Sequence, residues 1–228
     1  MQDKIKKQGA IAGISLLIMA LLAGFAFGYA HKTLVGDSPD LTFASLIANQ
    51  SLFFAELAAW TLIFITDIIV ALALYFFFRK ASRQMSALTA AIRIVYTLIL
   101  GIAIMQLFNI IPLLATDKPQ HITEVATQLQ LFERLWSIGL IIFGLHLIGL
   151  GYLSLKSKEV PVILGYLLYF GGLSYVFVHL SRQLQLLNAD VVGSAEQLLA
   201  LPMALAEILL AFWLIYHGFR KNKVATKG

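Results

Sequence analysis

Long apolar runs separated by short polar segments dominate the hydrophobic pattern of this chain. Six runs are long enough to cross a hydrocarbon layer of about 30 Å at about 1.5 Å per helical residue. They cover residues 9–30, 51–78, 88–114, 128–155, 161–180 and 198–219. The pattern predicts an all-α fold: a bundle of six transmembrane helices that forms a single membrane domain over residues 1–228.

The connecting segments are short and polar. Residues 31–50 begin with turn-forming residues and then become mildly amphipathic, which predicts a loop followed by a short interfacial helix. Residues 181–197 form a second, longer polar segment. None of these segments is long enough to hold a hydrophobic core of its own, so we expect any chemistry to lie in or at the membrane.

Composition supports a lipid environment. Hydrophobic residues make up 60% of the chain and charged residues 13%, whereas soluble domains carry about 25% charged residues. The chain has no cysteine, which excludes disulfides and thiolate metal sites. The formal net charge of +5 does not indicate nucleic-acid binding, because the basic residues lie in short runs between apolar segments instead of on one face.

Lysine and arginine gather in alternate connecting segments. One set comprises Lys4, Lys6, Lys7, Arg79, Lys80, Arg83, Lys156, Lys158, Arg220, Lys221, Lys223 and Lys227. The other segments hold only Lys32, Lys118 and Arg182. By the positive-inside rule both termini are expected in the cytoplasm. We therefore expect a multi-pass protein of the cell (inner) membrane, with the lipid bilayer as its partner.

Four ionisable residues are expected at similar depths near the middle of the membrane. Counted from the basic ends of their helices, Asp67, His146 and Glu207 lie roughly 15 to 20 Å deep. Arg93 begins about 10 Å deep, and its long side chain can reach further. Ionisable groups within membrane spans usually face the interior of the bundle. We therefore predict a midplane polar layer, with Asp67 as the partner of Arg93.

A second polar layer is expected toward the opposite ends of the helices. Glu56 lies eleven residues before Asp67 on nearly the same helical face. Glu133 and its neighbour Arg134 point away from the face of His146, so each needs a partner on another helix. Glu56 is the expected partner of Arg134. This outer layer comprises Glu56, Gln106, Asn109, Glu133 and Arg134.

Small residues occupy two faces of the fourth span. Gly139 and Gly149 share the face of His146, while Ser137, Gly144 and Gly151 lie on the opposite face. Small residues let neighbouring membrane helices approach closely. The pattern predicts a helix that is packed on both sides.

Motifs for metal or cofactor chemistry are missing from the sequence. No helix carries a paired-histidine zinc motif, and the five histidines lie at different depths, which disfavours haem. There is no phosphate-binding glycine loop and no nucleophile elbow. We therefore predict no metal site, no cofactor and no assigned catalytic residue.

The polar layers are compatible with three functions. In the first hypothesis, the chain binds or translocates a small polar solute or protons through the midplane layer of Asp67, Arg93, His146 and Glu207. Alternatively, it is an accessory or sensor subunit whose polar layer is purely structural. A membrane-embedded enzyme that uses His146 with Asp67 or Glu207 is the third hypothesis.

Several segments together resemble a known family. They include the block FGLHLIGLGYL at Phe143–Leu153, the acid and aliphatic run at Asp67–Tyr75, Arg93, the Pro161–Gly165 entry to the fifth span, and Glu207. This set resembles an uncharacterised bacterial family of multi-pass membrane proteins, domain of unknown function 4386. Val162 departs from it, since a basic residue is expected after the proline. The resemblance implies six helices, supplies no substrate, and singles out the same four midplane residues.

Overall fold

The computed structural model describes residues 2–115 and 119–220. All regular structure in these ranges is helical, and six helices are long and apolar enough to cross a membrane. The prediction of an all-helical fold with six long apolar helices is therefore confirmed. Lys118 and the C-terminal Lys221, Lys223 and Lys227 lie outside the described residues. The six long helices are α1 (Gln2–Phe25), α4 (Gln50–Phe78), α5 (Arg83–Phe108), α7 (Ile122–Ser157), α8 (Val162–Leu184) and α9 (Ala189–Phe219).

Short helical elements extend or connect the long helices. The first helix continues beyond α1 through a π-helical turn, η1 (Ala26–His31), and through α2 (Lys32–Leu34). The amphipathic segment forms α3 (Pro39–Ala48), which begins at Ser38, whose Oγ accepts a hydrogen bond from the Leu41 amide at 3.2 Å. A serine cap followed by proline is a typical helix start. The remaining short elements are α6 (Ile111–Leu114) and the 3-10 turn η2 (Pro119–His121).

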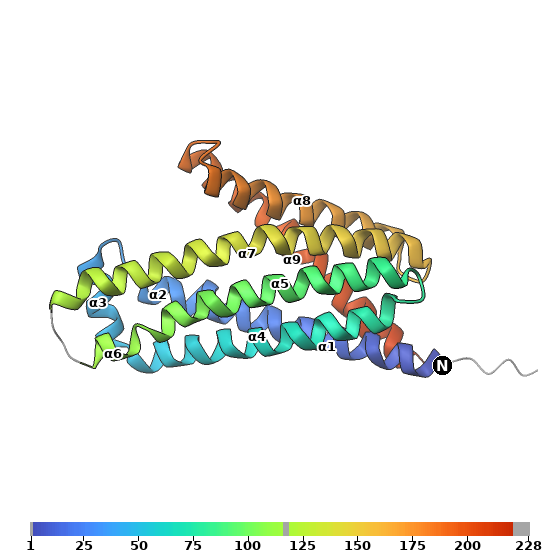
Figure 1. The fold of residues 1–228 in the computed structure, drawn as a ribbon, viewed down its shortest axis with the longest axis horizontal. Helices are drawn as coiled ribbons and strands as arrows, with labels where there is room; N and C mark the ends of the chain where they lie inside the picture. Colours follow the sequence, from blue (N-terminus) through green and yellow to red (C-terminus); the bar gives the residue numbers. More distant parts are fainter. Residues whose placement is uncertain (1, 116–118, 221–228) are drawn as a thin grey trace, which may run out of the picture.

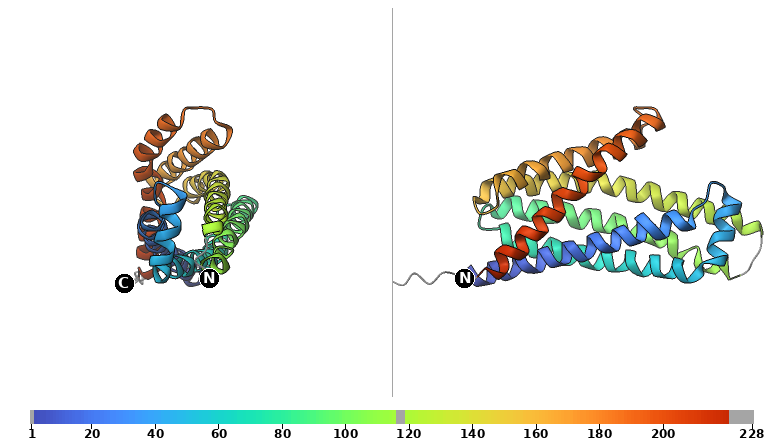
Figure 2. Two further views of the ribbon diagram at one scale, coloured as in Figure 1. Left: turned by 90° about the vertical axis from the view of Figure 1, so that its left-hand side faces the viewer. Right: turned by 180° about the vertical axis from the view of Figure 1, so that it is seen from behind.

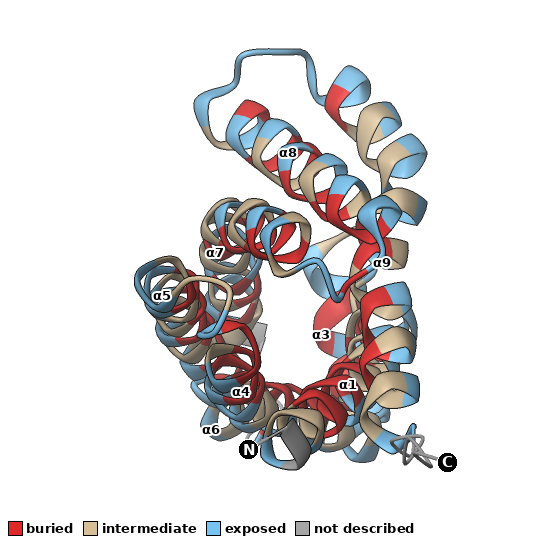
Figure 3. Cartoon of the chain, turned by 90° about the vertical axis from the view of Figure 1, so that its right-hand side faces the viewer, coloured by how far each residue is buried: buried red, intermediate tan, exposed pale blue. Residues whose placement is uncertain are grey.

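The six long helices pack in a closed ring. Each contacts two neighbours, in the order α1, α4, α5, α7, α8, α9 and back to α1. Figures 1 and 3 show this arrangement from the side and along the bundle axis. Every long helix also exposes large apolar side chains on its outer surface, for example Leu21, Leu62, Leu98 and Phe170. An apolar exterior around a ring of helices suits a lipid environment.

Glycine lets α7 approach both of its neighbours. Toward α8, a Cβ atom built on Gly144 would lie 2.7 Å from the carbonyl oxygen of Gly172, and one on Gly172 would lie 2.6 Å from that of Gly144. Toward α5, a Cβ atom on Gly149 would lie 2.5 Å from Thr89 Oγ1. Real Cβ atoms do not occur at such distances, so the backbones approach only because these positions lack side chains. The predicted two-sided packing of this helix is confirmed.

The hairpin of α8 and α9 leans away from the rest of the bundle at its tip. Gln185, with φ of 51°, ends α8, and α9 begins at Ala189. The polar segment 181–197 is therefore mostly helical, with only a short turn inside it. Figure 2 shows α9 beside α1 at the end where the chain begins, and diverging from it toward the hairpin tip.

Candidate functional site

Arg93 lies at the centre of the helix ring and contacts side chains from four other helices. Its Nε donates to Asp67 Oδ1 on α4 at 2.9 Å, and its Nη2 lies 2.7 Å from the same oxygen. Its Nη1 lies 3.0 Å from His146 Nε2 on α7 and 3.0 Å from Glu207 Oε1 on α9. The Met19 sulfur on α1 accepts a weaker bond from Nη2 at 3.5 Å. The predicted pairing of Asp67 with Arg93 is confirmed, and the four midplane residues form one connected group, called here the midplane cluster.

Hydrogen bonding defines the protonation of His146. Arginine has no acceptor, so His146 Nε2 must accept from Arg93 and carries no proton. The other ring nitrogen, Nδ1, lies 2.9 Å from the carbonyl oxygen of Thr89, which can only accept. His146 is therefore neutral, with its proton on Nδ1. It orients the guanidinium without adding a charge to the cluster.

The midplane cluster holds two carboxyl groups and one guanidinium. The side chains of Asp67 and Arg93 are 0% exposed, while that of Glu207 is 15% exposed. Asp67 Oδ1 receives both bonds from Arg93, whereas Asp67 Oδ2 is buried and has no hydrogen-bond partner among the described residues. A buried carboxylate oxygen without a donor is costly in a low-dielectric interior.

Two buried hydroxyl groups that have no hydrogen-bond partner within the described ranges lie between the midplane cluster and the 79–83 and 156–158 turns. They are Thr89 Oγ1 on α5 and Ser154 Oγ on α7. Thr89 is one helical turn from Arg93, and Ser154 is about two turns from His146 on the same side of the cluster. Hydroxyl groups can both donate and accept hydrogen bonds, so they are suited to lie along a proton path.

A histidine organises the outer layer. His31, at the end of η1, is 3% exposed. Its Nδ1 lies 2.8 Å from Glu56 Oε1 on α4, and its Nε2 lies 3.1 Å from Glu133 Oε1 on α7. Trp60 Nε1 also donates to Glu56 Oε1 at 3.3 Å. Ionised carboxylates only accept, so with both glutamates ionised His31 must donate from both nitrogens and carry a positive charge.

The predicted outer layer is not one group. Glu56 binds His31, and no ion pair joins it to Arg134 in the part of the chain that the structure describes. The predicted pairing of Glu56 with Arg134 is wrong. Asn109 contacts Gln128 at 3.4 Å, and the Gln106 amide bonds to the carbonyl oxygen of Ile102 in its own helix. Only Glu56 and Glu133 of the predicted set come together.

The sequence analysis missed His31 because it lies one residue beyond the predicted first span, at the start of an expected loop. The helix instead continues through η1 and α2. A π-turn inserts a residue and changes the direction of the following side chains, and such turns are frequent at functional sites. If the first helix had been predicted to continue beyond Ala30, His31 would have been placed inside the bundle, where it can reach Glu56 and Glu133.

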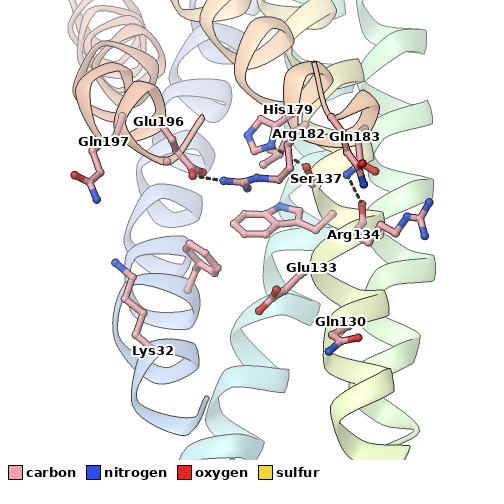
Figure 4. A pocket seen from close by; sticks show the side chains of 16 residues that line it. Lys32, Gln130, Glu133, Arg134, Ser137, His179, Arg182, Gln183, Glu196 and Gln197 are labelled. Carbon is pink, nitrogen blue, oxygen red and sulfur yellow. Dashed lines mark hydrogen bonds and ion pairs between the residues drawn. The ribbon is translucent and has the colours of Figure 1, made fainter. Parts of the chain in front are cut away.

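A pocket of about 900 Å³ opens between the η1–α2 segment, α7 and the α8–α9 hairpin. Figure 4 shows Glu133 and Ser137 from α7, His179 and Arg182 from α8, and Glu196 from α9 around it. Arg182 of α8 forms an ion pair with Glu196 of α9 within the hairpin. Ser137 Oγ and His179 Nδ1 are hydrogen bonded at 3.0 Å and both residues are buried.

Among the described residues, no group of three or more His, Asp or Glu side chains is placed to hold a metal ion.

The comparison with known families covers nearly the whole bundle. The model of the family described as a domain of unknown function, DUF4386, matches residues 11–218. The chain belongs to this family. The matched range takes in all four residues of the midplane cluster, His31 and every residue around the pocket.

This member of the DUF4386 family is also similar to a distant relative. An uncharacterized protein from Archaeoglobus fulgidus is 30% identical over 165 residues, which cover 72% of this chain and 85% of the relative. No solved structure matches the chain.

Proposed function

We propose that this multi-pass protein of the cell membrane binds a proton at the midplane cluster and passes it between the two sides of the membrane. The observation that carries the proposal is the buried, unpartnered Oδ2 of Asp67 beside a guanidinium that serves two carboxyl groups. With both carboxyl groups ionised, the cluster would hold one uncompensated negative charge in the membrane. A proton on Asp67 removes that charge.

Burial favours a proton over a larger solute. Asp67, Arg93 and His146 are all 0% exposed, and Arg93 already bonds to residues on α1, α4, α7 and α9. A polar solute would have to displace one of these bonds to reach the centre, whereas a proton needs no additional volume. The same packing also fits the alternative in which the polar layer is purely structural, and the experiment below separates the two.

Access is supported on both sides of the cluster. The hydroxyls of Thr89 and Ser154, which have no partner in the part of the chain that the structure describes, lie toward the 79–83 and 156–158 turns. Glu207 is the acid of the cluster that keeps part of its side chain, 15%, exposed. Ala200, which lines the pocket, is seven residues before Glu207, a rise of about 10 Å. Glu207 is therefore the group we expect to exchange protons with the pocket side.

The matched pair Asp67→Asn and Asp40→Asn tests proton transfer. Both remove a carboxylate, but Asp40 is exposed at the start of α3, far from Arg93. In liposomes that contain a pH-sensitive dye, we expect the wild-type protein and Asp40→Asn to dissipate an imposed pH gradient. Asp67→Asn should be no faster than liposomes without protein. Equal rates for Asp67→Asn and the wild type would favour the structural alternative.

We also propose that both termini lie in the cytoplasm, because the lysine- and arginine-rich segments share one side. The chain contains no cysteine, so single cysteines can be labelled without background. In intact cells, a membrane-impermeant maleimide should modify Asp37→Cys, in the segment before α3, and should modify Lys80→Cys, between α4 and α5, only after lysis. The reverse pattern would invert the topology.

A further inference from the structure

We propose that the pocket between the η1–α2 segment, α7 and the α8–α9 hairpin binds the anionic, phosphate-bearing headgroup of a membrane amphiphile. This inference is independent of proton transfer at the midplane cluster. Three features support the site: the depth of the pocket, the α8–α9 hairpin that forms one wall and has an apolar and a polar side, and the hydrogen-bond donors that face the pocket. A volume of about 900 Å³ lies within the usual range for small-molecule sites.

The pocket lies at the depth of lipid headgroups if the midplane cluster is at the centre of the membrane. Half of the hydrocarbon layer is about 15 Å, or about ten residues of helix. Counting ten residues along each helix from the cluster toward the pocket leads from Met19 to position 29, from His146 to position 136, and from Glu207 to position 197. The pocket is lined at these levels by Phe27 and Lys32, by Trp136 and Ser137, and by Glu196 and Gln197. Three helices thus place it independently at the hydrocarbon boundary.

The α8–α9 hairpin is apolar outside and polar toward the pocket. Leu184, Leu186, Leu198 and Leu201 are 60%, 60%, 78% and 66% exposed, and none of them lines the pocket. The pocket side carries Arg182, Gln183, Gln185, Glu196 and Gln197. An apolar outer surface keeps the hairpin in lipid, so the polar side needs a polar occupant at the same depth.

The charges around the pocket leave donors available. Glu196 is paired with Arg182, and Glu133 binds His31, so each of the two acids already has a partner. The side chain of Lys32 lines the pocket and makes no hydrogen bond or ion pair among the described residues.

Further donors remain on groups that already make one bond. Arg182 bonds to Glu196 through Nη2 and has further N–H groups. When Ser137 Oγ donates to His179 Nδ1, the proton of the neutral ring is on Nε2, which can then donate as well. The lining holds the cations Lys32, Arg134 and Arg182 and the acids Glu133 and Glu196, so the positive charges outnumber the negative ones. A net positive lining with N–H donors fits the oxygen atoms of a phosphate group.

The aromatic wall fits the rest of an amphiphile. Phe27 and Trp136 both line the pocket, and their rings meet edge to face with centroids 4.5 Å apart. Phe27 also stacks on His31, and Trp136 packs edge to face on Trp60 of α4. Aromatic rings at the boundary of the hydrocarbon layer commonly contact lipid near the headgroup.

A large side chain at position 193 would fill the pocket. A Cβ atom built on Gly193 meets no other atom within 4 Å, and the residue lines the pocket. Gly193→Trp should therefore fold and occlude the site. Gly24→Trp is the matched control, because Gly24 is equally open but does not line the pocket. Lys32→Gln removes a positive charge at the pocket, and Lys80→Gln removes the same charge between α4 and α5.

The test is native mass spectrometry of the detergent-purified protein titrated with phosphatidylglycerol or phosphatidylcholine. We expect preferential binding of phosphatidylglycerol, about fivefold weaker in Lys32→Gln, lost in Gly193→Trp and unchanged in both controls. Displacement by inorganic phosphate would assign recognition to the anion itself, and resistance to phosphate would assign it to the whole lipid; both support the site. Equal binding of the two lipids, or unchanged phosphatidylglycerol binding in Gly193→Trp, would overturn the proposal.

Discussion

Replacing Arg93 by methionine is expected to destabilise the protein by about 3–5 kcal/mol, the usual cost of removing one partner from a buried ion pair. The side chain is fully buried and supplies the hydrogen bonds that Asp67 Oδ1, Glu207 Oε1 and His146 Nε2 receive at the centre of the ring. Methionine has a similar length but no donor. The variant would therefore leave two carboxyl groups facing each other in the membrane interior.

Two further substitutions make this prediction specific. Arg134→Met removes an arginine that is exposed and forms no ion pair within residues 2–115 and 119–220, so we expect a change within about 0.5 kcal/mol. Adding Asp67→Asn and Glu207→Gln to Arg93→Met should recover part of the lost stability, because two neutral amides are less costly to bury than a pair of acids that carries an unpaired negative charge.

Denaturation of the purified protein by sodium dodecyl sulfate, followed by circular dichroism, measures all of these variants. The account is contradicted if Arg93→Met and Arg134→Met unfold at the same detergent fraction. It is also contradicted if the triple variant is less stable than Arg93→Met alone, because the buried carboxylates would then not be the source of the loss.

The second large effect is expected at the contact between α7 and α8. Gly172→Leu would place a Cβ atom 2.6 Å from the Gly144 carbonyl oxygen and 2.9 Å from atoms of Ile148. Two of these neighbours are backbone atoms of α7, which cannot rotate away as a side chain can. The helices must separate, and we expect a loss of about 1–3 kcal/mol or more.

Gly193→Leu is the control for this substitution. It introduces the same side chain on the neighbouring helix at a position where nothing lies within 4 Å, and leucine is the better helix former. Hydrogen exchange of the α8 amides should accelerate in Gly172→Leu and stay unchanged in Gly193→Leu. Similar exchange in both variants would show that the close approach of Gly144 and Gly172 does not hold the hairpin in place.

The midplane cluster could be predicted because depth and helical phase both follow from sequence. Counting from the basic turns placed Asp67, Arg93, His146 and Glu207 in one layer, and lipid leaves such groups few places other than the bundle interior. Their mutual geometry needed the structure. No spacing along the chain indicates that Arg93 serves both acids, or that Asp67 keeps one oxygen without a partner.

The outer layer was harder to predict because its partners come from segments that look like loops. His31 follows the apolar run, and only the continued helix turns it toward Glu56 and Glu133. Arg182 and Glu196 lie in a polar segment that is mostly helical, with its polar side toward the pocket. A polar helix face that lines a pocket has the composition of a loop, so hydrophobicity alone does not separate the two.

The measurement that tests the account most directly is infrared difference spectroscopy of the membrane-embedded protein against Asp67→Asn. Protonated and ionised carboxyl groups absorb at different frequencies. At neutral pH we predict a carbonyl-stretch band of one protonated carboxylic acid in the wild-type protein, and its loss in Asp67→Asn but not in Asp40→Asn. A wild-type spectrum without this band, or a band that persists in Asp67→Asn, would contradict a proton held at Asp67.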